Sequence, residues 1–508
     1  MNKLIAATST FEGPAIQWFK ISPVLALLGG ALFLILVGSL TSQWKRGWYA
    51  AASFVTAITA AVLTGVLWSQ MGDDKPSTLV GGALAFDRFA LFATFTICVS
   101  VALVSLVVND YLTREGEDGP EVYGLILAAA IGGVVMVSAN DLLVLFLGLE
   151  TLSLSFYLLT ASSRSRTQSG EAGLKYFILG GFASAFFLYG VALLFGASGT
   201  TNLQTMATVF AGEVTVPSNN GLLLAGIALL LVGFAFKVSL VPFHVWTPDV
   251  YQGAPTPITA LMGSVGKVAA FSALIRVFMI ALPSRIDDWR PAILVLALLT
   301  LVVGSVLAVV QTDVKRMLAY SSISHAGFIL VGLEAASHIG HSDSHLGTSS
   351  AMGYLFIYSI LVIGTFAVVS VVAGEGDNAT TLDAFKGLGK KRPVLALGMT
   401  VLLLAQAGVP LTSGFVAKFG IIRAAVSVES YALAVAAMLA AVIAAFLYLR
   451  IMVSMWLSDP TDDAPVSISK SAGLAITLAV AATPLIGVLP NLLIEALKLV
   501  TILENGRL

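Results

Sequence analysis

Long apolar runs recur from near the start of the chain to near its end. Hydrophobic residues make up 57% of the sequence and charged residues only 11%, which is too little charge to cover a soluble surface. A helix needs ~20 apolar residues to cross the ~30 Å hydrocarbon core of a bilayer. We therefore predict an all-α polytopic membrane protein with about fourteen transmembrane helices. The windows lie at 22–42, 47–70, 87–112, 121–139, 141–161, 172–197, 220–245, 256–281, 291–311, 315–336, 350–374, 393–424, 430–457 and 471–497.

Five ionisable residues interrupt these runs. Lys237, Lys267 and Lys418 lie well inside apolar stretches. Glu150 is central in its run, and Lys175, which heads the next run, is its natural counter-charge. A charge at the bilayer centre costs at least ~2.5–3.5 kcal/mol, so ionisable residues there indicate function. We interpret the set as a path for protons or cations, although Lys175 is close enough to a span end for its amine to reach the interface instead.

Histidines form a second group of candidates. His244 lies in a polar, proline-rich stretch, and its near-neutral titration suits a proton relay, although a histidine in such a loop often only satisfies backbone groups. His325, in SSISHAGF, is the weaker candidate of the two. His338, His341 and His345 share a short polar loop with a single carboxylate, which does not predict a metal site.

Two spans break their own helical pattern, and the breaks match. The seventh runs into VPFHVWTPDVYQGAPTP, and the twelfth contains AQAGVPLTSGF. The pattern GFxxK occurs beside both breaks, ending at Lys237 and Lys418. Paired interruptions in two halves indicate a transport site between repeats. We expect three helices in 1–120, a five-helix repeat in 121–281, an inverted copy in 291–458 and a last helix in 470–508.

The positive charges of the loops are uneven. Lys and Arg gather in the loops after odd-numbered spans, at positions such as Lys45, Arg164 and Lys390, and are fewer after even-numbered spans. Because cytoplasmic loops carry the excess of positive charge, we expect both termini on the outer, periplasmic side of a bacterial cell membrane.

The chain offers little for redox or nucleotide chemistry. Cys98 is its single cysteine, whereas iron–sulfur clusters need several thiolates. No GxGxxG after a strand and no P-loop occur, and a net charge of -1 argues against nucleic acid. We expect no cofactor in this chain, so any driving chemistry lies on another subunit.

Four stretches carry a family resemblance: GLETLSLSFYLL, EAGLKYFILGGFASAFFLYGVALLFGASGT, GFAFKVSLVPFHVWTPDVYQGAPTPITA and AGVPLTSGFVAKFGII. Together they resemble the antiporter-like, proton-translocating subunits of bacterial respiratory complex I (NADH-quinone oxidoreductase). The resemblance covers nearly the whole chain. It implies fourteen helices, two inverted five-helix repeats and broken seventh and twelfth helices.

The resemblance also implies roles for residues. In that family a fifth-helix glutamate pairs with a sixth-helix lysine, which correspond to Glu150 and Lys175. The lysines of the seventh and eighth helices correspond to Lys237 and Lys267, and the relay histidine to His244. The twelfth-helix residue is lysine in subunit N and glutamate in subunit M, so Lys418 favours subunit N. A long lateral C-terminal helix, typical of subunit L, is not expected here.

The resemblance implies a non-redox subunit of a proton-translocating NADH:quinone oxidoreductase. Its expected partners are other membrane-arm subunits, including the antiporter-like subunits L and M and small membrane subunits, within the lipid bilayer. The whole complex is expected to use NADH, FMN, iron–sulfur clusters and a quinone, either ubiquinone or menaquinone. Two alternatives stay open: a component of a multi-subunit sodium/proton antiporter without redox coupling, and a structural spacer in the membrane arm.

Overall fold

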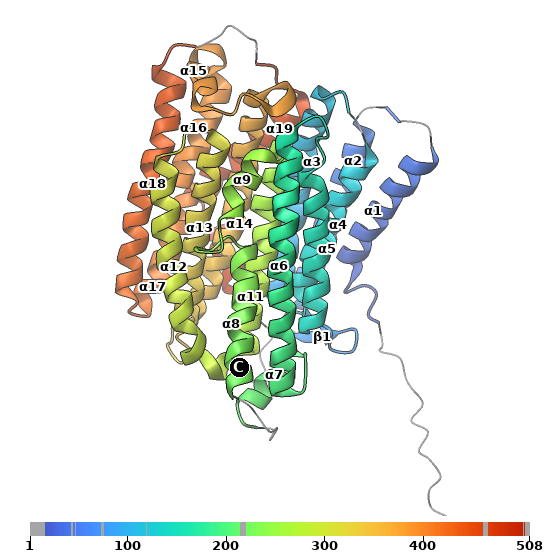
Figure 1. Ribbon diagram of the computed structural model, residues 1–508, viewed down its shortest axis with the longest axis vertical. Coiled ribbons are helices and arrows are strands. Elements are labelled where there is room, and N and C mark those ends of the chain that lie inside the picture. Colours follow the sequence, from blue (N-terminus) through green and yellow to red (C-terminus); the bar gives the residue numbers. More distant parts are fainter. Residues whose placement is uncertain are drawn as a thin grey trace, which may run out of the picture.

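The computed structural model describes residues 16–502 except 42–43, 46, 73–75, 118, 214–219, 461–465 and 501. Over that part of the chain, long helices run side by side along the long axis of the molecule (Figure 1). Thirteen of the described helices are long and apolar enough to cross a membrane. The predicted twelfth span is split into two shorter helices, α16 (Pro393–Ala407) and α17 (Ser413–Ser427). The all-α membrane fold is therefore confirmed.

Of the first three helices, α1 and α2 are the more exposed and α3 is mostly buried, and a short hairpin joins α2 to α3. β1 pairs with β2 in antiparallel register at the end of the molecule that also carries α7 (Figure 1). The bounds are α1 (Ser22–Leu40), α2 (Trp48–Met71), β1 (Ser77–Leu79), β2 (Leu84–Phe86) and α3 (Arg88–Arg114).

The next group of helices contains the first break. α8 ends at Lys237, and the helix resumes only at Trp246 in α9. A π-helical turn, Met262–Gly266, divides the following span directly before Lys267. The bounds are α4 (Pro120–Ser138), α5 (Leu142–Thr160), α6 (Thr167–Ser198), α7 (Leu203–Phe210), α8 (Asn220–Lys237), α9 (Trp246–Gly253), α10 (Thr256–Leu261) and α11 (Lys267–Ile280).

The last group contains the second break, which falls between α16 and α17. Gly408 takes a left-handed conformation there with φ +89°, which suits a residue without a Cβ. The remaining bounds are α12 (Ile286–Val309), α13 (Val314–Ala336), α14 (His345–Ala373), α15 (Leu388–Lys391), α18 (Tyr431–Leu457), α19 (Lys470–Val488) and α20 (Asn491–Lys498), with 3-10 turns at Pro283–Arg285, Glu375–Asp377 and Leu382–Phe385.

Two connections of the chain are built alike. Asp141 caps α5 and accepts the hydroxyl of Thr201 at 2.6 Å, while Asp313 caps α13 and accepts the hydroxyl of Thr380 at 2.5 Å. In each case the residue after the aspartate donates its backbone N–H to the carbonyl of the same threonine, at 2.9 and 2.8 Å. Because α5 and α13 are the fifth and tenth spans, they cross in opposite directions. Two inverted copies of one unit would show this arrangement.

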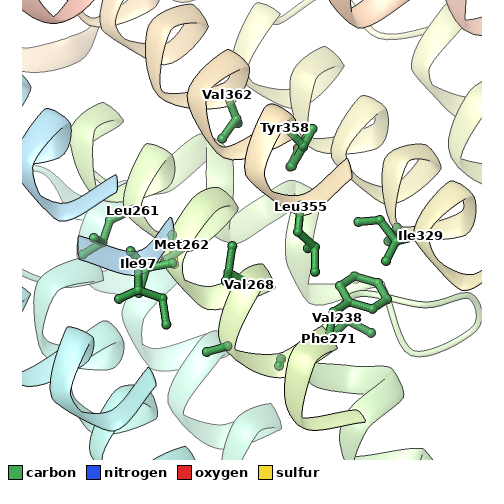
Figure 2. Close-up of a cluster of buried hydrophobic side chains, with 14 of the residues drawn as sticks. Ile97, Val238, Leu261, Met262, Val268, Phe271, Ile329, Leu355, Tyr358 and Val362 are labelled. Atoms are coloured by element: carbon green, nitrogen blue, oxygen red, sulfur yellow. The ribbon is translucent and has the colours of Figure 1, made fainter. Parts of the chain in front are cut away.

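An apolar cluster fills part of the interior of the bundle, where helices from different parts of the sequence meet. Figure 2 shows part of it, with Ile97 from α3, Phe271 from α11, Ile329 from α13 and Leu355 from α14. The span Thr256–Ile280 is wholly enclosed by the other helices, whereas α1 and α19 are mostly exposed. A wholly enclosed helix contacts only protein, so its polar side chains must find partners inside the bundle.

Candidate functional site

The first break holds a lysine in the interior. Lys237 ends α8 and is 8% exposed. Its Nζ donates to the hydroxyl of Ser153 at 2.8 Å and lies 3.4 Å from the hydroxyl of Tyr176. The same amine sits 5.7 Å from the centre of the Phe156 ring, at the distance of a cation–π contact. Neutral groups alone therefore stabilise the Lys237 ammonium at these distances.

A small cavity adjoins this lysine. It measures about 10 Å³ and is lined by Ser153, Tyr157, Ser184 and Lys237, among others. That volume is close to the space occupied by a single water. Ser184 also donates its hydroxyl to Glu150 at 2.5 Å. The cavity is therefore lined both by the Lys237 amine and by a serine that contacts the Glu150 carboxylate.

Lys175 does not contact Glu150. Its Nζ contacts Glu171 at 2.6 Å and Asp249 at 3.1 Å, and its side chain is 43% exposed. The expected ion pair between Glu150 and Lys175 is therefore not formed. The reason is spacing along α6, because Ser184 faces Glu150 and Lys175 lies nine residues earlier, about 13 Å along the helix axis.

Asp249 lies between Lys175 of α6 and Arg316 of α13 and contacts both. Arg316 of α13 contacts the other carboxylate oxygen of Asp249 at 2.6 Å, and it also donates to Gln252 at 3.2 Å. In the sequence, Asp249 is a single acid within the proline-rich stretch VPFHVWTPDVYQGAPTP, and nothing there indicates its partners. Its position between cations from α6 and α13 emerges only from the fold.

Lys267 lies at the end of the π-helical turn and is 2% exposed. Its Nζ donates to the backbone carbonyl of Ser322 on α13 and lies 5.5 Å from the centre of the Tyr358 ring. A π-helical turn often marks a functional position in a helix. This amine, like that of Lys237, is held by neutral groups.

A second small cavity joins His325 to Lys418. It also measures about 10 Å³, and its lining includes both residues together with Tyr354 and Tyr358. The His325 ring lies 2.6 Å from the Tyr354 hydroxyl through Nδ1 and 3.1 Å from the Tyr448 hydroxyl through Nε2. Lys418 donates to a backbone carbonyl of α16 at the second break, at 3.0 Å.

His244 stands apart from these contacts. It lies in the break after α8, is half-buried, and its Nδ1 has no hydrogen-bond partner among the described residues. The Tyr320 ring is its nearest aromatic neighbour, with centroids 6.5 Å apart. The structure therefore brings His244 to the boundary between the two groups of helices without bonding it to a lysine.

The three interior lysines (Lys237, Lys267 and Lys418) share one property. Within the described part of the chain, none of them has a carboxylate within 4 Å. A buried lysine without a counter-ion favours its neutral form, so it can release and regain a proton. The described residues contain no group of three or more His, Cys, Asp or Glu able to hold a metal.

Sequence patterns did not reveal the hydroxyl groups around the lysines. The hydroxyls of Ser153 and Tyr176 contact the Lys237 amine, and those of Tyr354 and Tyr448 contact the His325 ring. Serine and tyrosine within apolar runs were a usable signal, because a buried hydroxyl needs a partner. Which hydroxyl meets which amine depends on helices far apart in the sequence.

Comparison with known proteins places the chain in a family. A model described as "NADH:quinone oxidoreductase/Mrp antiporter, TM" matches residues 139–444. The NADH-quinone oxidoreductase subunit N 1 of Herpetosiphon aurantiacus is 38% identical over 499 residues, which cover 96% of this chain and 98% of that protein. The chain belongs to the NADH:quinone oxidoreductase/Mrp antiporter family.

Solved structures of the family share its architecture. A chain of respiratory complex I from Thermus thermophilus with bound aureothin superposes with a TM-score of 0.78 at 31% identity, covering 94% of this chain and 99% of that one. A chain of the Mrp complex from Dietzia sp. DQ12-45-1b gives a TM-score of 0.80 at 18% identity, covering 95% and 96%. At that identity the second likeness shows the fold alone. Sequence similarity thus favours the complex I branch of the family.

Proposed function

We propose that this chain is a proton-translocating membrane-arm subunit of an NADH:quinone oxidoreductase, of the subunit N type. One observation carries the proposal: three buried amines without carboxylate partners line the interior of a membrane-spanning bundle. Ionisable groups at membrane depth are costly and mark proton or ion paths. The naming of similar proteins as NADH-quinone oxidoreductase subunit N supports the same reading.

The proton route follows the order of the amines. A proton enters from the cytoplasm toward Lys237, passes Lys267 with His244 and His325 as relays, and leaves toward the outside by Lys418. The cavities beside Lys237 and Lys418 are each the size of a water. Water in them would shorten the proton transfers at both ends of the route.

Glu150 and Lys175 would couple this route to neighbouring subunits. In the arrangement described here Lys175 is held by Asp249 and Glu171, and its amine would swing toward Glu150 in another state. Two unit charges ~7 Å apart at an effective dielectric of ~20 interact by roughly 2.4 kcal/mol. A change of that size at Lys237 is comparable with the ~2.3 kcal/mol that moves one charge across 100 mV.

The chain would act without a redox centre of its own. Flavin, iron–sulfur clusters, NADH and the quinone would belong to other subunits of the complex, and its neighbours would be other antiporter-like and small membrane subunits. We place both termini on the outer side of a bacterial cell membrane, because the loops after odd-numbered spans hold most of the positive charge.

The repeat division belongs to the same proposal. Residues 121–281 and 291–458 would be inverted copies, each with a broken helix that ends or begins beside a lysine, after three helices in 1–120 and before the last span in 470–508. The matched connections at Asp141 and Asp313 support this division. Inversion would give each half a similar proton path that opens to the opposite side.

Replacing Lys237 with alanine tests the proposal. In an assembled complex, Lys237→Ala should reduce proton translocation per NADH oxidised by about tenfold or more, because the buried amine is the carrier at the entry. Lys390→Ala is the matched control, since its side chain is 59% exposed and pairs with Asp459. Undiminished proton translocation in Lys237→Ala would overturn the proposed route.

A sodium/proton antiporter without redox coupling is the second candidate, because the family includes Mrp antiporters. A mass-spectrometric inventory of the purified complex separates the two. Flavin and iron–sulfur subunits would support the first function. Their absence, together with sodium-dependent proton exchange in vesicles, would support the second.

A further inference from the structure

The buried carboxylates in this bundle differ in the groups that they contact. In the described chain there are five of them, and three contact a Lys or Arg: Asp87, Asp110 and Asp377. A fourth, Asp313, accepts the backbone N–H of Arg316 at the start of α13, where the helix dipole favours negative charge. The fifth, Glu334, is 2% exposed and has neither kind of partner.

Among the described residues, the side chain of Glu334 contacts a serine and a histidine. The Ser430 hydroxyl lies 3.0 and 2.9 Å from the two carboxylate oxygens, and the His338 Nε2 lies 3.0 Å from one of them. A single hydroxyl proton satisfies one oxygen at a time. The two side chains in contact with this buried carboxylate are therefore a hydroxyl and an imidazole, and the imidazole can exchange a proton with it.

The position of the pair relates it to the proposed route. His325 lies nine residues before Glu334 on α13, about 13 Å along the helix. Lys418 lies on α17, which ends at Ser427, and Ser430 caps the next helix, α18. Of the helices that line the second cavity, α13 carries Glu334, at the end opposite its cap Asp313, and α17 leads to Ser430.

His338 connects the buried acid to the surface. Its side chain is 23% exposed, compared with 2% for Glu334. The other titratable groups of the surrounding segments make no hydrogen bond or ion pair with Glu334, and these are Arg423, Glu429, His341, Asp343 and His345. A proton on Glu334 therefore has one titratable neighbour in contact, and that neighbour reaches solvent.

We propose that Glu334 and His338 form the group that releases the proton at the outer face. This inference rests on the proposed function and names its outlet. The Lys418 ammonium gives up a proton to water and becomes a neutral amine, and water between the helices passes a proton to the Glu334 carboxylate, which becomes a carboxylic acid. His338 then accepts that proton on Nε2 and gives one to external water from its other ring nitrogen.

Glu334→Gln is the main test, in complexes reconstituted into liposomes with the outer face toward the lumen. The amide keeps the shape and the serine contact but cannot exchange a proton. Proton translocation per NADH oxidised should fall by about a hundredfold, the lower end of the range that a positioned acid–base group contributes. Its dependence on lumenal pH should also flatten. Glu334→Asp, which keeps a carboxyl group, should restore part of both.

Glu429→Gln is the matched control, because Glu429 precedes Ser430 and is exposed; it should behave like the wild type. His338→Gln provides a second variant if Glu334→Gln does not assemble, and it should flatten the lumenal pH dependence. If Glu334→Gln or His338→Gln translocates protons at the wild-type level with the wild-type dependence on lumenal pH, the proposed role of the pair in proton release is wrong. If Lys418→Ala abolishes translocation while Glu334→Gln does not, the outlet is wrong and the proposed function stands.

Discussion

Two sets of buried cations in this protein differ in what surrounds them. Arg276 on α11 and Lys315 on α13 have no exposed side-chain surface, and each contacts a carboxylate, Asp87 at 2.7 Å and Asp377 at 2.9 Å respectively. The three interior lysines are nearly as buried but contact hydroxyls, carbonyl oxygens and aromatic rings. Burial is the same in both sets, and the partner is what differs.

The difference separates fixed charge from exchangeable charge. A buried ion pair whose hydrogen bonds are satisfied keeps both ions, and removing one partner costs about 3–5 kcal/mol. A buried amine among neutral partners has no such anchor, so its proton can leave without breaking a pair. We infer that the paired cations hold the bundle together, while the interior lysines carry protons.

The largest expected effect is on stability at the paired cation of α11. Arg276→Met removes the guanidinium that contacts Asp87 and the Val137 carbonyl, and should destabilise the subunit by about 3–5 kcal/mol. Lys267→Met, on the same helix, should leave stability unchanged or raise it, because it removes a buried amine that contacts no carboxylate among the described residues. Thermal unfolding and subunit retention of the purified complex measure both. Equal losses in the two variants would remove the distinction drawn above.

A smaller effect is expected at the other paired site. Asp377 contacts Lys315, Arg166 at 3.2 Å and the Thr256 hydroxyl at 2.6 Å. Burial alone raises the pKa of Asp377, but Lys315, Thr256 and Arg166 outweigh it and hold that pKa below its usual value of 3.8. Asp377→Asn keeps some hydrogen bonds, and should cost about 3 kcal/mol.

The pH dependence of that loss follows from the direction of the shift. A carboxyl group with a lowered pKa in the folded state stabilises the protein above its ordinary pKa and ceases to do so as pH falls through the folded value. The gap in unfolding temperature between wild type and Asp377→Asn should be full at neutral pH and close below pH 3.8. A gap that widens in acid would contradict the assigned ion pair.

Much of the fold could be predicted because a bilayer imposes a single length on apolar runs. The two breaks were also predictable, since Pro242 and Gly408 interrupt otherwise continuous spans. The π-helical turn before Lys267 was not, because no residue type marks it. Lys315 stands at the first residue of a predicted span, where a lysine usually reaches water, yet it is buried. Its partner lies 62 residues away, and sequence spacing does not predict such a contact.

The site shows the same limit. The positions of the interior lysines and Glu150 within apolar runs identified them as candidates, because a charge at membrane depth is costly and indicates function. The expected ion pair between Glu150 and Lys175 is not formed, because the direction of the side chains along α6 decides which residue faces α5. Glu334 was missed because it lies at a span end, where an acid usually reaches water. Burial by neighbouring helices distinguishes it, and only the fold supplies that.

The smallest expected effect concerns a neutral partner of an interior lysine. Ser153→Ala removes the hydroxyl 2.8 Å from Lys237 and leaves that of Tyr176 at 3.4 Å. Losing one such hydrogen bond costs about 1 kcal/mol, so proton translocation should slow by about fivefold while stability changes little. Ser155→Ala is the control, because that buried hydroxyl bonds the Thr151 carbonyl of its own helix at 2.8 Å. If the two variants translocate protons equally fast, neutral partners do not position the amine, and the contrast with the paired cations would then rest only on the presence or absence of a contacting carboxylate.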